Sequence, residues 1–249
     1  MCQAIVKPAG ITIQKNLLQL AWNDNADGAG FAYRRKDKII IRKGFFTFRK
    51  FWSSYRKSGA EMLDCLIHFR FATHGNKNKA NCHPHRFENA AMVHNGIFSQ
   101  ALPKPNDARS DTRIFLDDLY APAYKTNSET PHEFIQRNKI YTQSQIASNK
   151  IAFLSPDGFT ILNENYGAWV GGVWWSSGLP TPRYKWSDVA SDKWAKILSS
   201  HYDDGQDDLP YSYRSIKSDG ARCQLCGQWR DQSVMLAGSL ACGYCYEEF

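Results

Sequence analysis

The chain has 249 residues, seven cysteines and a formal net charge of +7, from 31 basic and 24 acidic side chains. Its pI is near 9.0, its mean hydropathy is −0.51, and 43% of its residues are hydrophobic, which excludes a disordered or fibrous chain. No apolar run approaches the roughly 18 residues that a membrane-spanning helix needs, and the first residues lack the pattern of a signal peptide. We therefore expect a soluble cytoplasmic protein that has no membrane contact.

Predicted strands and helices follow one another along the first 175 residues. The strands are predicted, in chain order, at Gly30–Tyr33, Lys38–Arg42, Cys65–Phe71, Ala90–His94, Lys150–Leu154, Gly158–Leu162 and Trp169–Trp175. Helical patterns cover Phe45–Ser58, Asp111–Leu119 after a Ser110 cap, and Thr130–Arg137. Many strands with few helices favour an α+β layered domain over repeated βαβ units.

The composition changes after Pro182. A short helix is predicted at Ser187–His201, and an acidic stretch with Asp203, Asp204, Asp207 and Asp208 follows it. The predicted domains are therefore a large one at 2–186, a helix and acidic linker at 187–216, and a small module at 217–249.

The positive charge is concentrated between Arg34 and Lys57. This window holds ten basic residues and one acid, a balance of +9, together with six aromatic residues. Basic residues interleaved with aromatics are typical of nucleic-acid contact. A strand pair with apolar residues inward and a solvated basic face fits the window equally well. The sequence leaves both interpretations open.

Four of the seven cysteines form two Cys-x-x-Cys pairs separated by fifteen residues. This spacing is typical of a structural Zn²⁺ bound by four thiolates, in which protein occupies every coordination position and the metal has no catalytic role. Disulfides, a redox pair and an iron–sulfur cluster are the alternatives. The predicted ligands of this zinc ribbon are Cys223, Cys226, Cys242 and Cys245.

A further cysteine, Cys2, follows the initiator Met1 directly. Removal of Met1, which a small second residue allows, would leave a cysteine whose α-amine has an ordinary pKa of about 7.7–8.0. A neutral amine of this kind accepts the thiol proton, so that one residue supplies both nucleophile and base. The signal is weak by itself, because proteins that begin Met-Cys need not be enzymes.

Four further segments carry residues that are typical of catalytic sites. They are His68-Phe-Arg-Phe-Ala-Thr-His-Gly75, Asn81-Cys-His-Pro-His85, Ala91-Met-Val-His-Asn-Gly-Ile97 and Ser110-Asp-Thr112. Taken singly, each has a structural interpretation: hydrogen-bonded core histidines, a buried ion pair, a turn and a carboxylate at a helix end.

Together and in this order, these segments resemble the class II glutamine amidotransferase domain, which is a member of the N-terminal nucleophile hydrolases. The resemblance covers roughly residues 2–175 and includes the Asp27-Gly-Ala-Gly30 turn. The chain departs from the family's usual strings at Phe71, where the family has Trp or Tyr, and at Gly28, where the family usually has Ser.

The resemblance implies a four-layer αββα sandwich in which Cys2, on the first strand, faces a glutamine pocket. Cys2 would attack the side-chain amide of glutamine, and Asn95 and Gly96 would form the oxyanion hole. Arg70 would bind the α-carboxylate of glutamine and Asp111 its α-ammonium group, while Thr73 and His74 would line the pocket. The glutaminase chemistry would need no cofactor.

We therefore expect a glutaminase that passes ammonia to a separate synthase, because residues 176–249 are too short for a synthase domain. One alternative is a hydrolase of a γ-glutamyl amide of a small molecule. Another is a non-catalytic protein that binds nucleic acid or protein through residues 34–57 and the zinc ribbon.

Overall fold

The computed structural model describes residues 2–124 and 129–180, together with the backbone of four short strands between 221 and 242. The chain divides into two compact units, Met1–Pro180 and Thr181–Phe249. The predicted boundaries at 186 and 216, the predicted helix Ser187–His201 and the acidic stretch lie outside the described residues. No helix of the described part is long and apolar enough to cross a membrane.

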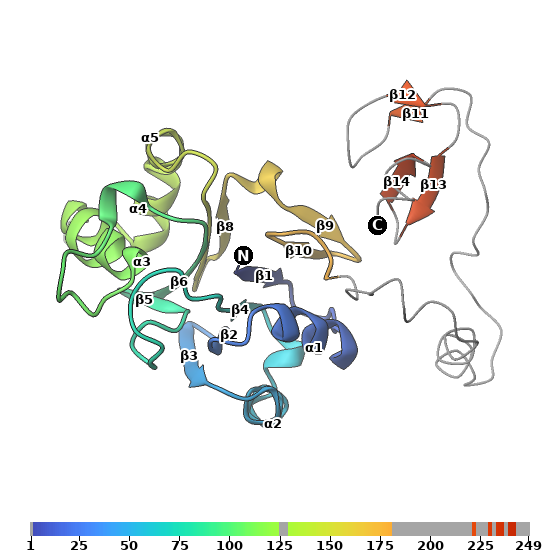
Figure 1. Ribbon diagram of the computed structural model, residues 1–249, viewed down its shortest axis with the longest axis horizontal. Coiled ribbons are helices and arrows are strands. Elements are labelled where there is room, and N and C mark those ends of the chain that lie inside the picture. Colours follow the sequence, from blue (N-terminus) through green and yellow to red (C-terminus); the bar gives the residue numbers. More distant parts are fainter. Residues whose placement is uncertain are drawn as a thin grey trace. The chain divides into compact units, whose positions relative to one another are not determined.

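Two antiparallel sheets form the first unit (Figure 1). The larger has the strand order β3-β2-β4-β1-β10-β9, and the smaller has the order β5-β6-β7-β8. The strands of the larger sheet are β1 (Gln3–Lys7), β2 (Ala29–Arg35), β3 (Lys38–Phe45), β4 (Cys65–Phe69), β9 (Ala168–Val170) and β10 (Val173–Trp175). Those of the smaller sheet are β5 (His85–Phe87), β6 (Ala90–Asn95), β7 (Lys150–Ser155) and β8 (Gly158–Leu162).

The helices fall into two groups along the chain. The first group comprises α1 (Lys15–Asp24) and α2 (Phe48–Ser58), and a 3₁₀ turn η1 (Ala60–Met62) follows it. The second comprises α3 (Asp111–Ile114), which continues as the π-helical turn η3 (Phe115–Tyr120), then α4 (Pro131–Arg137) and α5 (Lys139–Gln145). Three further 3₁₀ turns are η2 (Ser99–Ala101), η4 (Ala121–Ala123) and η5 (Glu164–Tyr166).

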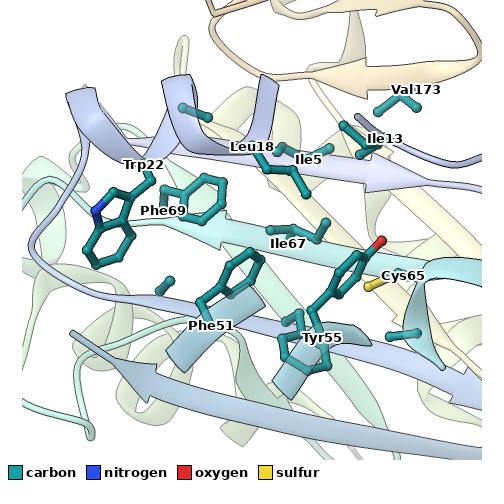
Figure 2. Close-up of a cluster of buried hydrophobic side chains, with 14 of the residues drawn as sticks. Ile5, Ile13, Leu18, Trp22, Phe51, Tyr55, Cys65, Ile67, Phe69 and Val173 are labelled. Atoms are coloured by element: carbon teal, nitrogen blue, oxygen red, sulfur yellow. The ribbon is translucent and has the colours of Figure 1, made fainter. Parts of the chain in front are cut away.

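Alternation along the strands creates three separate apolar cores. In β1, Ile5 belongs to the core that includes α1 and α2, whereas Ala4 and Val6 belong to a core made by both sheets. Figure 2 shows the first of these cores, in which Phe51 and Tyr55 of α2 pack with Ile67 and other residues of the sheet. A third core joins the other face of the smaller sheet to α3, η3 and α4. The layers therefore run helix, sheet, sheet, helix, as the resemblance implies.

The basic window at 34–57 forms the β2–β3 hairpin and α2, and its aromatic and basic residues are separated. Phe51 and Tyr55 are fully buried and Phe48 nearly so. Thr47 caps the helix by accepting a hydrogen bond from the Lys50 N–H, at 3.4 Å between oxygen and nitrogen. Most of the aromatic residues therefore belong to the core, as the structural interpretation predicts. Eight of the ten basic residues are exposed, and Arg34 and Lys43 are partly buried.

The α+β class with antiparallel sheets is confirmed, and the predicted strands and helices are present with small shifts. The segment Trp169–Trp175 is not one strand: Gly171 and Gly172, with φ of +57° and +74°, turn it into the β9–β10 hairpin. Cys2 lies immediately before β1 rather than on it. The sequence reasoning missed α1 and α5. In α1 the apolar stripe is short, because only Leu18, Ala21 and Trp22 are buried.

The described part of the second unit consists of two short hairpins. They pair β11 (Ala221–Arg222) with β12 (Trp229–Arg230), and β13 (Ser233–Leu236) with β14 (Ser239–Cys242). Three of the predicted zinc ligands, Cys223, Cys226 and Cys245, lie outside the described residues, and Cys242 is described by its backbone alone.

Candidate active site

Strand register brings distant segments to one end of the two sheets. Because β1 and β4 are antiparallel with Gln3 opposite Phe69, the residue before β1, Cys2, meets the residues after β4. In the same way, the Ser176 N–H at the end of β10 donates to the Ala4 carbonyl, at 3.0 Å. The end of β6 in the other sheet reaches the same end of the sheets, because its last residue, Asn95, contacts Ser176. Four chain segments therefore converge around the Cys2 thiol.

The backbone of Phe71 holds the Cys2 thiol. Its N–H donates to Cys2 Sγ at 3.2 Å, and the thiol in turn donates to the Phe71 carbonyl at 3.3 Å. The Phe71 ring is exposed, so the departure from Trp or Tyr at this position leaves both backbone contacts in place. Desolvation of the half-buried thiol raises its pKa, while the Phe71 hydrogen bond acts in the opposite direction. The thiol is therefore protonated at neutral pH and needs a base.

A small pocket opens beside this thiol. It is lined by six of the seven residues that the resemblance assigns to catalysis and substrate binding: Cys2, Arg70, Thr73, His74, Gly96 and Asp111. The remaining lining residues are Phe71, His83, His94, Ser110 and Thr112. Residues up to 109 positions apart in the sequence, from Cys2 to Asp111, thus share one cavity.

The pocket contains one buried cation and one buried anion. Arg70 is 3% exposed and Asp111 is 5% exposed. Arg70 donates from its two terminal nitrogens to the carbonyls of His74 at 2.7 Å and Asn76 at 3.0 Å. Asp111 accepts from the Phe98 N–H at 2.8 Å. Among the described residues neither side chain forms an ion pair, although a buried charge is strongly stabilised by an opposite one.

The Asn95 side chain is held by two serines that the sequence analysis missed. Its Nδ2 donates to Ser176 Oγ and to Ser177 Oγ, both at 2.8 Å. Ser176 Oγ also accepts from the Ala4 N–H at 2.9 Å, and Ser177 Oγ donates to the Cys2 carbonyl at 3.1 Å. Both serines follow β10, about 80 positions from Asn95, and no motif marks them. Asn95 itself does not line the pocket.

Two glycines allow close backbone approach near the site. Gly96 has φ +144°, and a Cβ there would lie 1.9 Å from Asn149 Oδ1. A Cβ at Gly30, in the Asp27-Gly-Ala-Gly30 turn, would lie 2.1 Å from the His83 carbonyl oxygen, between the two sheets. Any side chain at either position would move the catalytic elements apart.

Four buried histidines form a cluster, and two of them, His83 and His94, line the pocket. The His68 and His83 rings stack with centroids 4.0 Å apart, and those of His83 and His85 are 4.5 Å apart. His94 makes hydrogen bonds through both ring nitrogens, to Thr112 at 2.8 Å and to Asn149 at 2.9 Å. Burial lowers the pKa of His94 to about 4 and that of His68 to about 3. These two are therefore neutral core histidines, as their structural interpretation predicts.

Metal-binding clusters are not found in the described part of the chain: no three His, Cys, Asp or Glu side chains there are placed to hold a metal ion. The buried histidine cluster is thus held by stacking and hydrogen bonds.

The chain is similar in sequence to known proteins over part of its length. No protein-family model matches the chain. It is 30% identical over 118 residues to a glutamine–fructose-6-phosphate aminotransferase [isomerizing] of Chlamydia abortus, a match that covers 43% of this chain and 19% of that relative. It is 60% identical over 117 residues to the protein of the same name from Bradyrhizobium diazoefficiens, with 44% and 19% covered.

The described domain is class II glutamine amidotransferase-like. The chain spans 19% of the length of the two relatives named above. Among solved structures, a glutamine phosphoribosylpyrophosphate amidotransferase from B. subtilis aligns with 70% of this chain and 41% of that one, with a TM-score of 0.47 and 15% identity. A likeness of that size carries no argument.

Proposed function

We propose that the amidotransferase-like domain hydrolyses the side-chain amide of free glutamine. The observation that carries the proposal is the pocket in which the Cys2 thiol lies beside a buried cation and a buried anion. Free glutamine is a zwitterion at one end and an amide at the other. The unpaired charges of Arg70 and Asp111 match the zwitterion, and the thiol matches the amide.

In the proposed reaction, Cys2 Sγ attacks the amide carbon and a γ-glutamyl thioester forms. The α-amine of Cys2, freed by removal of Met1, takes the thiol proton and gives it to the departing ammonia. Water then hydrolyses the thioester to glutamate and regenerates the thiol. This base is needed because burial raises the pKa of the thiol.

The negative charge that develops on the amide oxygen would be stabilised by the Gly96 N–H and the Asn95 side-chain amide. Both protons of Asn95 Nδ2 are already donated to serines. Donation to the substrate therefore requires that one of these bonds is exchanged. The exchange is favourable in the transition state, because hydrogen bonds to a charged acceptor are about twice as strong as neutral ones.

The experiment is a comparison of purified wild type with Cys2→Ala. Wild type should release glutamate from glutamine, and the variant should release none, while both show the same thermal unfolding. Glutamate release that persists in Cys2→Ala, or that is absent from wild type, would refute the proposal. Intact mass provides a second test, because a mature chain that retains Met1 has no α-amine on Cys2.

The ammonia that the proposed reaction releases needs an acceptor. The relatives named above are, by name, aminotransferases that join glutamine to a second substrate. We propose that a separate synthase takes up the ammonia. Glutamine hydrolysis by the isolated chain should then rise when that partner is added.

From their spacing alone, we propose that the four cysteines of the second unit bind one structural Zn²⁺. Such an ion would stabilise the small module and would take no part in glutamine hydrolysis.

A further inference from the structure

A groove between β3 and α2 carries a dense positive charge that the proposed glutaminase reaction does not use. Its volume is about 800 Å³. Four exposed cations line it, Arg42 from β3 and three from α2: Arg49, Lys50 and Lys57. Among the described residues no acidic side chain lines the groove, and α2 itself contains none.

The four cations are unpaired, whereas two other basic residues of the same window form ion pairs. Arg34 forms an ion pair with Asp64, and Arg56 forms one with Glu61 at 3.1 Å. Within the part of the chain that the structure describes, no acid pairs with the four groove cations. Like charges that gather without partners repel one another, so the groove gains stability when an anion enters it.

Two of the four cations lie at a place on α2 where a bound anion is especially favourable. Arg49 and Lys50 lie in the first turn of an eleven-residue helix, where the backbone dipole already favours negative charge and disfavours cations. Ser53 and Ser54, one turn further on, also line the groove, and neither hydroxyl has a hydrogen-bond partner among the described residues. Helix N–H groups, hydroxyls and cations together are the donors that contact phosphate oxygens.

The extent of the charge indicates an extended anion. Lys57 lies eight positions after Arg49, which corresponds to about 12 Å along an α-helix. One strand of a duplex presents a phosphate about every 3.4 Å along its axis, so the cations cover roughly three to four phosphates. A single phosphate would need far fewer cations.

The lining also distinguishes between classes of partner. Protein interfaces have an apolar and aromatic centre, but Phe45 is the one large apolar residue along this groove. Single strands are bound by stacking of bases on exposed aromatic rings, but the aromatic residue that lines this groove, Phe45, is half-buried, and the exposed Phe46 ring does not line it. The cations and hydroxyls that line the groove are suited to backbone phosphates.

We infer that the β3–α2 groove binds the phosphodiester backbone of a nucleic-acid duplex, without reading its sequence. The groove contacts the loop that follows β4, since a Cβ at its lining residue Gly44 would lie 2.6 Å from the Lys79 side chain. Lys79 is in the same loop as His74 and Asn76, whose carbonyls Arg70 holds. A bound duplex would therefore lie next to the loop that completes the glutamine site.

The test measures fluorescence anisotropy of a labelled 25-base-pair duplex, as DNA and as RNA, with the full chain between 50 and 200 mM salt. Wild type should bind at least one duplex with a Kd of about 1 to 100 µM. Arg49→Glu with Lys50→Glu should weaken binding at least 10-fold and lower the salt slope by about 2. The matched control is Arg35→Glu with Lys38→Glu, which makes the same charge change at the exposed β2–β3 turn, outside the groove. It should weaken binding less than about 3-fold.

Three outcomes would overturn the inference. One is that wild type binds neither duplex, and another is that the groove and control variants lose affinity equally, which indicates a diffuse charge effect. The third is that poly-glutamate of equal charge binds the groove more tightly than the duplex, which indicates an acidic protein partner. Thermal unfolding of each variant establishes that the chain is folded, and glutaminase activity is expected to be unchanged in both.

Discussion

Asn95 illustrates how single side chains are positioned for chemistry by partners that are remote in sequence. Ser176 is fully buried and fixes the amide, since it also accepts a hydrogen bond from β1. Ser177 is exposed and forms the bond that is more easily exchanged. We therefore expect the two serines to have different effects on the proposed reaction.

Ser176→Ala should lower kcat for glutamine hydrolysis by about 3- to 10-fold, the equivalent of one neutral hydrogen bond, with KM unchanged. It should also lower the free energy of unfolding by about 1–3 kcal/mol, because the buried Ala4 N–H loses its acceptor. Ser177→Ala should leave kcat within about 3-fold, because it frees one Asn95 proton for the substrate oxygen. Steady-state kinetics and denaturant unfolding provide the measurements. An equal loss of kcat in both variants would contradict the assignment.

Arg70 is the residue that should determine affinity for glutamine. Its guanidinium has five N–H donors, and two terminal nitrogens already hold the loop carbonyls of His74 and Asn76. Arg70→Lys keeps the charge but cannot both hold the loop and bind a carboxylate in bidentate fashion. We expect KM for glutamine to rise about 10- to 100-fold, the range for a hydrogen bond to a charged group. An unchanged KM would place the α-carboxylate elsewhere.

At the scale of elements, four buried histidines connect the two sheets. They lie on β4, β5 and β6 and in the segment before β5. His68 on β4 contacts the His94 carbonyl on β6 at 2.9 Å, and the His94 N–H donates to His83 at 3.1 Å. Burial keeps the pKa of each of these histidines below the ordinary 6.5, and that of His85 as well. The cluster is therefore stable only while it is neutral.

This predicts an acid-sensitive fold. Each buried histidine has a folded-state pKa below its unfolded-state pKa of about 6.5. The neutral histidines therefore stabilise the folded state fully above pH 6.5. This stabilisation is lost as the pH falls toward the folded-state pKa, which is about 4 for His94. One such histidine should lower the free energy of unfolding by about 2 kcal/mol at pH 5. Urea unfolding at pH 7 and pH 5 measures the change, with His85→Asn as the variant that should reduce the slope. Equal stability at both pH values would contradict the prediction.

At the scale of the whole molecule, the first unit has three apolar cores of its own, so it should not depend on metal. We expect one Zn²⁺ per chain by elemental analysis, and a loss of that zinc in Cys226→Ser. Glutamine hydrolysis should stay within about 2-fold of wild type, because none of the pocket residues lies in the second unit. Zinc in less than stoichiometric amount, with the cysteines intact, would refute the metal assignment.

The sequence was sufficient for features that depend on local chemistry. Short continuous apolar runs predict the β6, β7 and β8 strands, because each of these strands buries both of its faces, in different cores. The Thr130 capping box and the Ser110 cap are read directly from neighbouring residues, and both are present. Residues 15–24 were missed because their apolar stripe is too short to distinguish from a loop.

Of the seven cysteines, the structure describes the surroundings of Cys2, Cys65 and Cys82, and it places the dense positive charge of residues 34–57 on β2, β3 and α2. The sequence by itself determined the α+β class and the candidate residues, since these rest on periodicity and motif. Only the tertiary structure decided that Ser176 and Ser177 hold Asn95, that the window's aromatic residues are mostly buried, and that four of its cations share a groove. The physical reason is that strand register and layer packing, rather than sequence distance, determine which side chains meet.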